Sequence, residues 1–211
     1  MKRALVLLAA LVLTGCSGGS PAPAPSDAFA AATAALRAGD YAFTFDGVDG
    51  SGSGVTHRPS RSAGLRVDRE TTPTRFEYRW VGPDTYTRSG TEAALELSVP
   101  WLHRKTGQEH DGDLTELATM LDQVRTANPD GHDVAGAMNA KLLAGSLLWD
   151  ADVKQMGSAG NNVPYRATLD GQGRLTQLVA LVPGGSWVVK VTGYGTQKAQ
   201  PKPAGPVKEG P

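Results

Sequence analysis

The residue with the most distinctive chemistry is Cys16, the only cysteine in the 211-residue chain. It follows an apolar run at positions 4–13 that begins after Lys2 and Arg3, and Gly15 immediately precedes it. A positive start, an apolar segment and a small residue are the features of an export signal. About 20 apolar residues are needed to cross a bilayer, so this run is too short to span one. We therefore expect the Cys16 thiol to undergo covalent modification rather than to form an internal disulfide.

The four residues 13–16, Leu-Thr-Gly-Cys, match the lipobox of bacterial lipoproteins. The match implies cleavage before Cys16, diacylglycerol on its sulfur and usually a further acyl chain on the new amino terminus. One acyl chain anchors a protein only marginally, whereas two or three make the attachment durable. We expect removal of the signal peptide 1–15 and a lipid anchor at Cys16. The alternative is an ordinary secretory signal followed by an unmodified thiol.

Other reactive side chains form no recognisable catalytic or metal site. Segments 110–113 and 130–133 combine His with Asp but do not give the 1, 3, 5 and 12 ligand positions of a calcium loop. In the glycine-serine run 50–54, Gly52 stands where a nucleophile elbow needs serine, so we expect a flexible hairpin loop there. The histidines lack the paired spacing of a zinc-binding helix; they are His57, His103, His110 and His132. We therefore expect a protein that is not an enzyme and needs no metal or cofactor.

The charge balance excludes one class of partner. The chain has 21 basic and 21 acidic residues, and loss of Lys2 and Arg3 with the signal would leave a slight acidic excess. Nucleic-acid binding requires a clustered basic surface, so we expect no nucleic-acid partner. An acylated lone cysteine leaves no disulfide, so packing alone must stabilise the exported domain.

Two segments of low apolar content flank the folded part. Residues 16–26 alternate proline with alanine after a Ser-Gly run and are expected to form a flexible, extended tether. Residues 199–211 include four prolines and little apolar surface to repay the entropy of ordering, so we expect a disordered tail. Residues 27–198 are long enough for one domain with its own core.

Alternating apolar and polar residues predict strands in the first half of this domain. Aromatic residues share one parity over 41–45 and again over 76–80. The turn residues 82–84 predict a hairpin between them and the next strand. The strands expected here cover 41–46, 55–57, 63–67, 75–81, 85–88 and 95–104, the last interrupted at Pro100.

A change of period predicts helices elsewhere. Residues 27–38 are alanine-rich, with Ser26 as a plausible N-cap and Gly39 as a C-terminal stop. Residues 114–124 carry Leu and Val at helical spacing behind an Asp-x-x-Glu capping arrangement, and Asn-Pro at 128–129 would end that helix.

The second half of the domain returns to strands. Segment 132–149 fits either helical spacing or two strands, and we favour strands. A short helix is expected over 150–156, followed by strands over 165–169, 175–182 and 187–194. Together these elements predict an α+β fold in which a curved antiparallel half-barrel sheet wraps around two or three helices.

Several segments also share an order and spacing with a known family. They are 76–88, 100–102, 133–136 with the strand-like 140–146, 163–175 and 191–195. In this order they resemble the actinobacterial envelope lipoproteins of the LppX and LprG type, whose fold is similar to that of the LolA lipoprotein carrier. The resemblance implies an incomplete barrel with an apolar cavity that receives acylated lipids or glycolipids, and it favours strands over 132–149.

The resemblance makes the inward members of the first strands candidates for lining that cavity. They are Phe43, Phe45, Leu65, Val67, Phe76, Tyr78, Trp80 and Tyr86. The alternative for each is plain core, packed against the helices. Arg75, Arg79 and Arg88 could meet an acidic headgroup at the rim, or could form a solvated outer face.

Two functional hypotheses from different classes follow. The first is a noncatalytic lipoprotein, anchored on the outer side of the cell membrane, that binds or carries an acylated lipid or glycolipid. The second is a structural or sensory envelope lipoprotein with a closed cavity that binds a protein partner. An envelope hydrolase has the least support, because no acid, base and nucleophile occur at a recognisable spacing.

Overall fold

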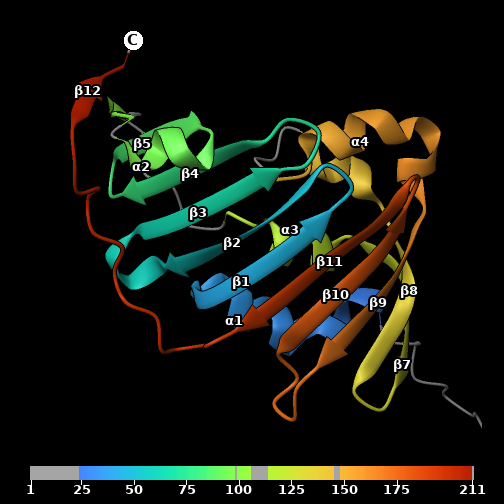
Figure 1. Ribbon diagram of the computed structural model, residues 1–211. Coiled ribbons are helices and arrows are strands. Elements are labelled where there is room, and N and C mark those ends of the chain that lie inside the picture. Colours follow the sequence, from blue (N-terminus) through green and yellow to red (C-terminus); the bar gives the residue numbers. More distant parts are fainter. Residues whose placement is uncertain (1–23, 98, 106–113, 145–147, 211) are drawn as a thin grey trace, which may run out of the picture.

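One twelve-stranded sheet organises the computed structural model, which describes residues 24–97, 99–105, 114–144 and 148–210. Its strands are β1 (Asp40–Gly47), β2 (Gly50–His57), β3 (Ser62–Arg69), β4 (Thr74–Val81), β5 (Asp84–Gly90), β6 (Trp101–Lys105), β7 (Val124–Asp130), β8 (Asp133–Met138), β9 (Val163–Leu169), β10 (Leu175–Val182), β11 (Gly185–Thr192) and β12 (Val207–Glu209). The order across the sheet is β12-β6-β5-β4-β3-β2-β1-β11-β10-β9-β8-β7, and only β12 and β6 pair in parallel (Figure 1). The predicted α+β class with a curved, mostly antiparallel sheet is confirmed.

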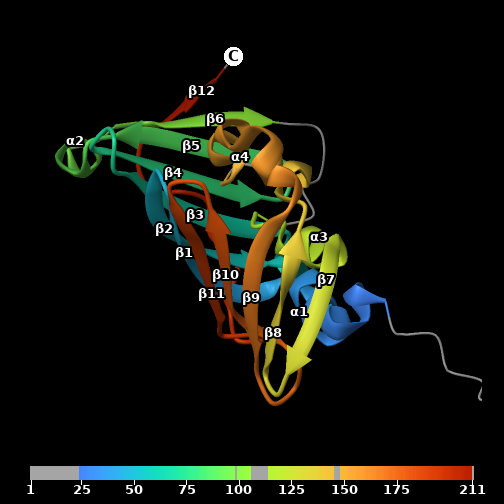
Figure 2. The same cartoon turned by 90° about the vertical axis from the view of Figure 1, so that its right-hand side faces the viewer.

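The helical segments are short. The 3-10 turns are η1 (Pro25–Phe29), η2 (Arg58–Ser60), η3 (Ala140–Leu143) and η4 (Gly157–Asn161), and the α-helices are α1 (Ala30–Ala38), α2 (Glu92–Glu96), α3 (Leu117–Asp122) and α4 (Asp150–Met156). Helices α1 and α3 lie side by side against the concave side of the sheet (Figure 2). The helices expected over 27–38 and 150–156 are confirmed. In the described part of the chain, every helix is too short or too polar to cross a bilayer.

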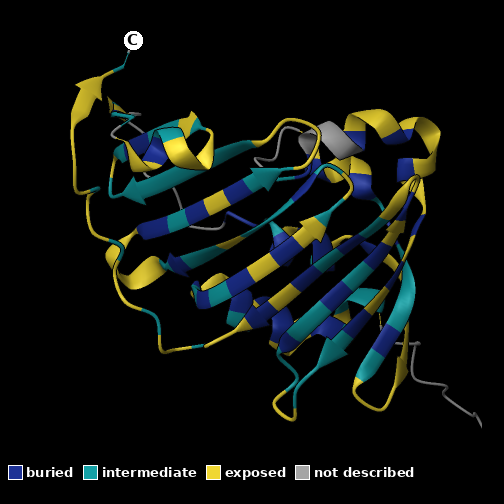
Figure 3. Cartoon of the chain, viewed as in Figure 1, coloured by how far each residue is buried: buried dark blue, intermediate teal, exposed yellow. Residues whose placement is uncertain are grey.

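The core fills the space between the sheet and these helices. On β1, Tyr41, Phe43 and Phe45 are buried while Thr44 and Asp46 are exposed, the alternation that the sequence predicted (Figure 3). We use "inner face" for the side of the sheet that carries these aromatic rings and "outer face" for the opposite side. The inner face and the helices share one cluster of buried apolar side chains.

Strand β2 occupies the glycine-serine run, so the flexible loop expected over 50–54 is wrong. Phe43 lies opposite Gly54 and Phe45 opposite Gly52 in the ladder. A Cβ atom on Gly54 would come 2.7 Å from Phe43 Cε1, and one on Gly52 would come 2.6 Å from Phe45 Cε1. The glycines therefore leave room for two phenylalanine rings that lie across β2, and the run is a strand because its neighbours supply the apolar surface that it lacks.

The helix predicted over 114–124 begins later and ends sooner than expected, since α3 starts at Leu117 and the Glu116 side chain does not cap it. Helix α3 stops at Asp122, and β7 begins at Val124, whose buried side chain fits the helical spacing but belongs to a strand. Pro129, read as a helix terminator, lies instead in β7 at the edge of the sheet, where a missing N–H removes no ladder bond that the sheet needs. The hydroxyl of Tyr165 also donates to the backbone oxygen of Thr126 at 2.9 Å.

Two further expectations are corrected in part. The strand predicted over 95–104 is helical in its first part, where α2 forms. The Thr91 hydroxyl accepts a hydrogen bond from the Ala94 amide and so caps this helix. The second part of the predicted strand is β6. The strands favoured over 132–149 are confirmed as β8, whereas residues 140–143 form η3, which begins where the Asn139 side chain accepts from the Lys141 amide.

The C-terminal segment is ordered through residue 210, so the disordered tail expected over 199–211 is wrong for that part. The Gln200 amide donates to Ser62 Oγ at 2.8 Å, and Lys202 Nζ lies 3.1 Å from Asp84 Oδ2. Strand β12 then pairs with β6, with the Gly210 amide 2.7 Å from the His103 oxygen. The tail repays its ordering entropy by covering the free backbone groups of an edge strand.

His103 joins this tail to the sheet through two carboxylates. Its Nδ1 lies 2.9 Å from Glu209 Oε2, its Nε2 lies 2.9 Å from Asp84 Oδ1, and its ring stacks on Tyr86 at 4.9 Å between centroids. The hydrogen bonds to Glu209 and then to Asp84 raise the pKa of His103. Lys202, beside Asp84, is the further cation at this junction.

The tail should therefore loosen as the pH rises. A group whose pKa is higher in the folded state stabilises that state fully below its unfolded pKa, about 6.5 for histidine, and this contribution is lost as pH rises through the folded value. We expect the Gly210 amide to lose protection against hydrogen exchange over this interval, after correction for the intrinsic exchange rate. NMR exchange measurements from about pH 5.5 upward, starting below the unfolded pKa, test this.

The matched control is Glu209→Gln, which keeps the size of the side chain and removes its charge. This variant should show a smaller change in Gly210 protection over the same pH interval. An identical pH profile in the two proteins would show that His103 does not control the attachment of the tail.

Candidate functional site

Seven of the eight predicted cavity-lining residues share the inner face. The strand register places Phe43, Leu65 and Tyr78 in one row across β1 to β4, with Gly54 between the first two. A second row contains Phe45, Gly52, Val67 and Phe76, and Trp80 lies opposite Ala63. The alternation in the sequence therefore brings these seven side chains together. The predicted lipidation residue, Cys16, lies outside the described residues.

The eighth residue, Tyr86, lies on the outer face. The hairpin between β4 and β5 has two turn residues, and the register pairs Trp80 with Thr85 and Arg79 with Tyr86. Residues paired across the ladder point to the same face of the sheet. Tyr86 therefore lies on the outer face with its partner Arg79, whereas Trp80 and its partner Thr85 lie on the inner face. Tyr86 is buried beneath the C-terminal tail and the His103 ring.

Burial of the seven side chains decreases from the centre of the sheet toward β4. Phe43 and Leu65 are 2% and 4% exposed, and Phe45 and Val67 are also buried. On β4, by contrast, Phe76, Tyr78 and Trp80 are half-buried and pack against the rim of the core. We refer to these three residues as the aromatic column.

The polar atoms of the aromatic column have partners within the column and on β5. Ring centroids are 6.1 Å apart between Phe76 and Tyr78 and 5.2 Å between Tyr78 and Trp80. Trp80 Nε1 donates to the Tyr78 hydroxyl at 2.5 Å, and burial raises the pKa of that hydroxyl despite this hydrogen bond. What remains half-exposed is therefore mainly apolar ring surface, next to the Thr87 and Ser89 side chains of β5 on the same face.

The enclosed space found on this side is small. Phe45, Val67, Arg69 and Leu148 are among the residues that line a cavity of about 20 Å³. That volume holds about one water molecule and no acyl chain. A larger apolar ligand on the inner face would lie against the aromatic column.

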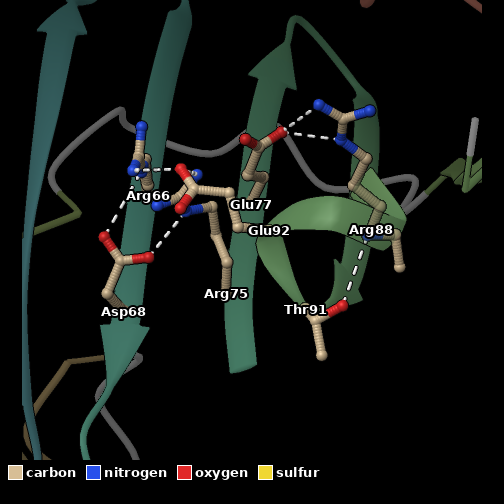
Figure 4. A network of polar contacts seen from close by, with 8 residues as sticks. Arg66, Asp68, Arg75, Glu77, Arg88, Thr91 and Glu92 are labelled. Atoms are coloured by element: carbon tan, nitrogen blue, oxygen red, sulfur yellow. Dashed lines mark hydrogen bonds and ion pairs between the residues drawn. The ribbon is translucent and has the colours of Figure 1, made fainter. Parts of the chain in front are cut away.

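The three arginines considered as headgroup contacts all lie on the outer face. Arg75 lies 2.6 Å from both Asp68 and Glu92, and its hydrogen bond to Asp68 is the main cause of its raised pKa (Figure 4). Arg88 makes two contacts with Glu77, each 2.6 Å, and its guanidinium lies 4.5 Å over the Trp101 ring. Arg75 and Arg88 are therefore held in ion pairs on the side of the sheet away from the aromatic column.

Arg79 differs from the other two. Its contacts in the described residues are the Pro201 oxygen, 3.3 Å from its Nη1, and the Trp101 ring at 5.5 Å. It lines an outer-face groove of about 490 Å³ that the sequence analysis did not find. The small outward residues at 53, 55 and 64 are the pattern that could have revealed this groove. Within the described ranges, no group of His, Cys, Asp and Glu is placed to hold a metal ion.

Comparisons with known proteins identify the fold. No protein-family model matches the chain, and no curated protein does. Among solved structures, the chain is similar to LprF from Mycobacterium bovis, with a TM-score of 0.59 and 17% identity over 89% of this chain and 100% of that one. It is also similar to the Mycobacterium tuberculosis lipoprotein LppX, with a TM-score of 0.46 and 10% identity over 82% of this chain and 96% of that one. The chain therefore has the fold of LprF, a mycobacterial protein of the LppX and LprG type, as the resemblance in its sequence predicted.

Proposed function

We propose that this protein is a noncatalytic lipoprotein, anchored through Cys16 on the outer side of the cell membrane, that binds or carries an acylated lipid or glycolipid on the inner face of its sheet. The observation that carries the proposal is the aromatic column, which leaves apolar ring surface half-exposed at the rim of a buried core. The LprF fold and the lipobox at 13–16 support the same conclusion.

The energetics favour acyl chains as the part of the ligand that supplies affinity. Complete burial of two chains of about 16 carbons would contribute on the order of 20 kcal/mol before the costs of binding, and chains that only cover the aromatic column would gain in proportion to the area they bury. Each ring of the column offers apolar area, the Trp80 N–H donates to the Tyr78 oxygen, and the Tyr78 hydroxyl also has a hydrogen bond with Thr85. Acyl chains can therefore cover these rings without leaving a donor unpaired.

The strand beside the column suits the polar part of such a ligand. Thr87 lies opposite Tyr78 and Ser89 opposite Phe76, so two hydroxyls continue the inner face next to the rings. A headgroup placed there would exchange water for hydroxyl hydrogen bonds, which select among headgroups more than they add affinity.

The test is an anchorless protein, Cys16→Ala, expressed in a related bacterial host and purified without detergent. We expect this variant to leave the membrane fraction, because it has no sulfur to acylate, and to retain lipid in a ratio near one per protein. Organic extraction and mass spectrometry measure the lipid, and membrane fractionation against the wild type measures the anchor.

The two parts of the proposal fail separately. If Cys16→Ala stays with the membrane as the wild type does, the anchor assignment is wrong. If the purified protein contains no lipid and takes up none from detergent-solubilised envelope lipids, the carrier assignment is wrong. In that case the alternative, an envelope lipoprotein that binds a protein partner with a closed interior, becomes the better explanation.

A further inference from the structure

On the outer face of the sheet, short side chains of β1 to β3 lie beside long charged side chains of β3 to β5. The register aligns two sets of outward residues across the strands: Ala42–Val55–Gly64–Arg79, and Thr44–Ser53–Arg66–Glu77–Arg88. At Val55, Ser53 and Gly64 the side chains are short or absent, whereas the β3 to β5 positions beside them carry arginine or glutamate. The groove of about 490 Å³ lies over these small residues.

The groove has a mixed polar and apolar lining that carries more basic than acidic residues. Arg66, Arg79 and Arg88 line it, with Glu77 as the one acidic residue. The Glu77 carboxylate is engaged by Arg88 at 2.6 Å. Arg66 is 46% exposed and lies 3.3 Å from Asp68 and 3.8 Å from Glu92. Arg66 is therefore paired with carboxylates that lie outside this lining, and the positive charge in excess of these pairs is that of Arg79.

Arg79 is the residue of this lining with spare donors. No carboxylate among the described residues lies within ion-pair distance of it, and one of its five N–H groups is directed to the Pro201 oxygen. Its Cα partner across the ladder is Gly64, so no side chain on β3 fills the space beside its guanidinium. A planar guanidinium at the edge of an open groove is suited to bind two oxygens of a phosphate.

The rest of the lining provides hydroxyl and amide groups. Thr44, Ser53 and Thr192 line one side of the groove, and Gln200 of the C-terminal tail lines another. A second groove of about 510 Å³ continues from the first and shares Thr44, Ser53 and Arg66 with it. Lys190 lines this second groove together with Asp46 and Asp68, and it is an exposed cation for which the described residues provide no ion pair.

We propose that this outer groove is a binding site for a phosphorylated sugar, with Arg79 as the main phosphate contact and the hydroxyl-bearing side chains as contacts for the sugar. The groove volume lies in the range of small-molecule sites, about 300 to 1,000 Å³, and exceeds the space that an inorganic phosphate needs. The excess cationic charge matches a phosphate, and the hydroxyl and amide groups match the donors and acceptors of a pyranose ring. An apolar protein partner fits less well, because the large apolar residues Phe43, Leu65 and Trp101 of the lining are buried and leave little apolar side-chain surface to contact.

This site goes beyond the proposed lipid-binding function and lies on the opposite side of the sheet from the aromatic column. Tyr78 faces inward and Arg79 outward on the same strand, so their substitution affects different sites. Lipid content and sugar-phosphate binding can therefore be measured on the same preparation, and either one can be lost without the other.

The experiment is isothermal titration calorimetry of the Cys16→Ala protein with a set of hexose 1-phosphates and 6-phosphates at low ionic strength. We expect at least one of them to bind, and Arg79→Gln to weaken that binding by 10-fold or more. The matched control is Arg166→Gln, another exposed arginine on the sheet, 3.1 Å from Asp133 and outside the groove, which should bind as the parent does.

A second variant tests the shape of the groove without changing its charge. Gly64→Val places a side chain in the groove, with its Cβ 3.1 Å from the flexible end of Gln200, and it should also weaken binding by 10-fold or more. Melting temperatures confirm that each variant is folded. If either groove variant binds as tightly as the parent, the site is not this groove.

Three ligand controls identify the source of the phosphate. Neutral hexoses should bind at least 10-fold more weakly than their phosphates, and inorganic phosphate should also bind more weakly. Inorganic phosphate binding as tightly as every hexose phosphate would overturn the sugar part of the proposal. Binding to phosphatidylglycerol vesicles in the absence of hexose-phosphate binding would assign the groove to a membrane surface instead, and no binding of any hexose phosphate would overturn the proposal entirely.

Discussion

Gly52→Val is expected to lower the free energy of unfolding by about 3 kcal/mol, at the upper end of the usual cost of overpacking. The new Cβ would overlap the backbone oxygen of Arg66 and lie 2.6 Å from Phe45 Cε1. The first contact is with the backbone of β3 and the second is with a buried ring, so neither can move away without disturbing the ladder or the core. Urea denaturation followed by tryptophan fluorescence measures the change.

The matched control for this prediction is Ser53→Val on the same strand. Ser53 is exposed on the outer face, and valine has a higher strand propensity than serine, so its effect should lie within about 0.5 kcal/mol of zero. Equal losses in both variants would mean that β2 tolerates no change at either face. A small loss in Gly52→Val alone would mean that Phe45 can reorient within the core.

The β2 strand also shows where sequence patterning stops being informative. Alternation of large apolar and polar residues correctly predicted β1, β3 and β4, because each of these strands carries its own apolar surface. Residues 50–54 carry none, and their strand conformation depends on Phe43 and Phe45 from the neighbouring β1. The residue pattern of β2 alone therefore cannot predict a strand that is stabilised by contacts with side chains of β1.

The errors in the candidate site have a similar origin. Parity along β4 correctly grouped Phe76 with Tyr78 and Trp80, but the register of the hairpin, not parity alone, decides the face on which Tyr86 lies. The outer groove depends on residues of β1, β2 and β3 that lie side by side only because of the strand register. Composition gave no indication of it, because Ser53 and Gly64 read individually as ordinary surface residues.

The two ends of the fold were predicted with different success for a related reason. The alanine-rich segment 27–38 is helical and ends at Gly39 as expected, although Ser26 lies within η1 and does not cap α1, which begins at Ala30. The tail beyond residue 199 has no local preference for order, yet the free edge of β6 and the side chain of His103 hold it in place. The sequence of the tail indicates that it has no intrinsic order, but it does not indicate that β6 and His103 bind it.

The largest loss of stability from a side-chain truncation is expected at Trp149. This residue is 1% exposed, and its ring lies 4.8 Å from Trp187 and 5.8 Å from Phe45 between centroids. Its Nε1 also donates to the Thr115 oxygen at 3.2 Å. Trp149→Ala removes packing that joins the chain before α4 to the sheet and leaves a buried carbonyl without this donor, so we expect a loss of about 3 to 5 kcal/mol in urea denaturation.

Trp80→Ala is the informative comparison, because it truncates the same residue type at the half-exposed aromatic column. Its loss of stability should be smaller, about 1 to 3 kcal/mol, since part of its ring is exposed to solvent. If the column is the lipid-binding surface, Trp80→Ala should reduce the lipid recovered by extraction several-fold while most of the fold stability remains. Trp149→Ala, measured at a temperature where it is folded, should retain its lipid in proportion to the folded fraction.

A Trp80→Ala protein that loses as much stability as Trp149→Ala and keeps its lipid would contradict this prediction. That result would place Trp80 in the core and remove the main support for a ligand on the inner face.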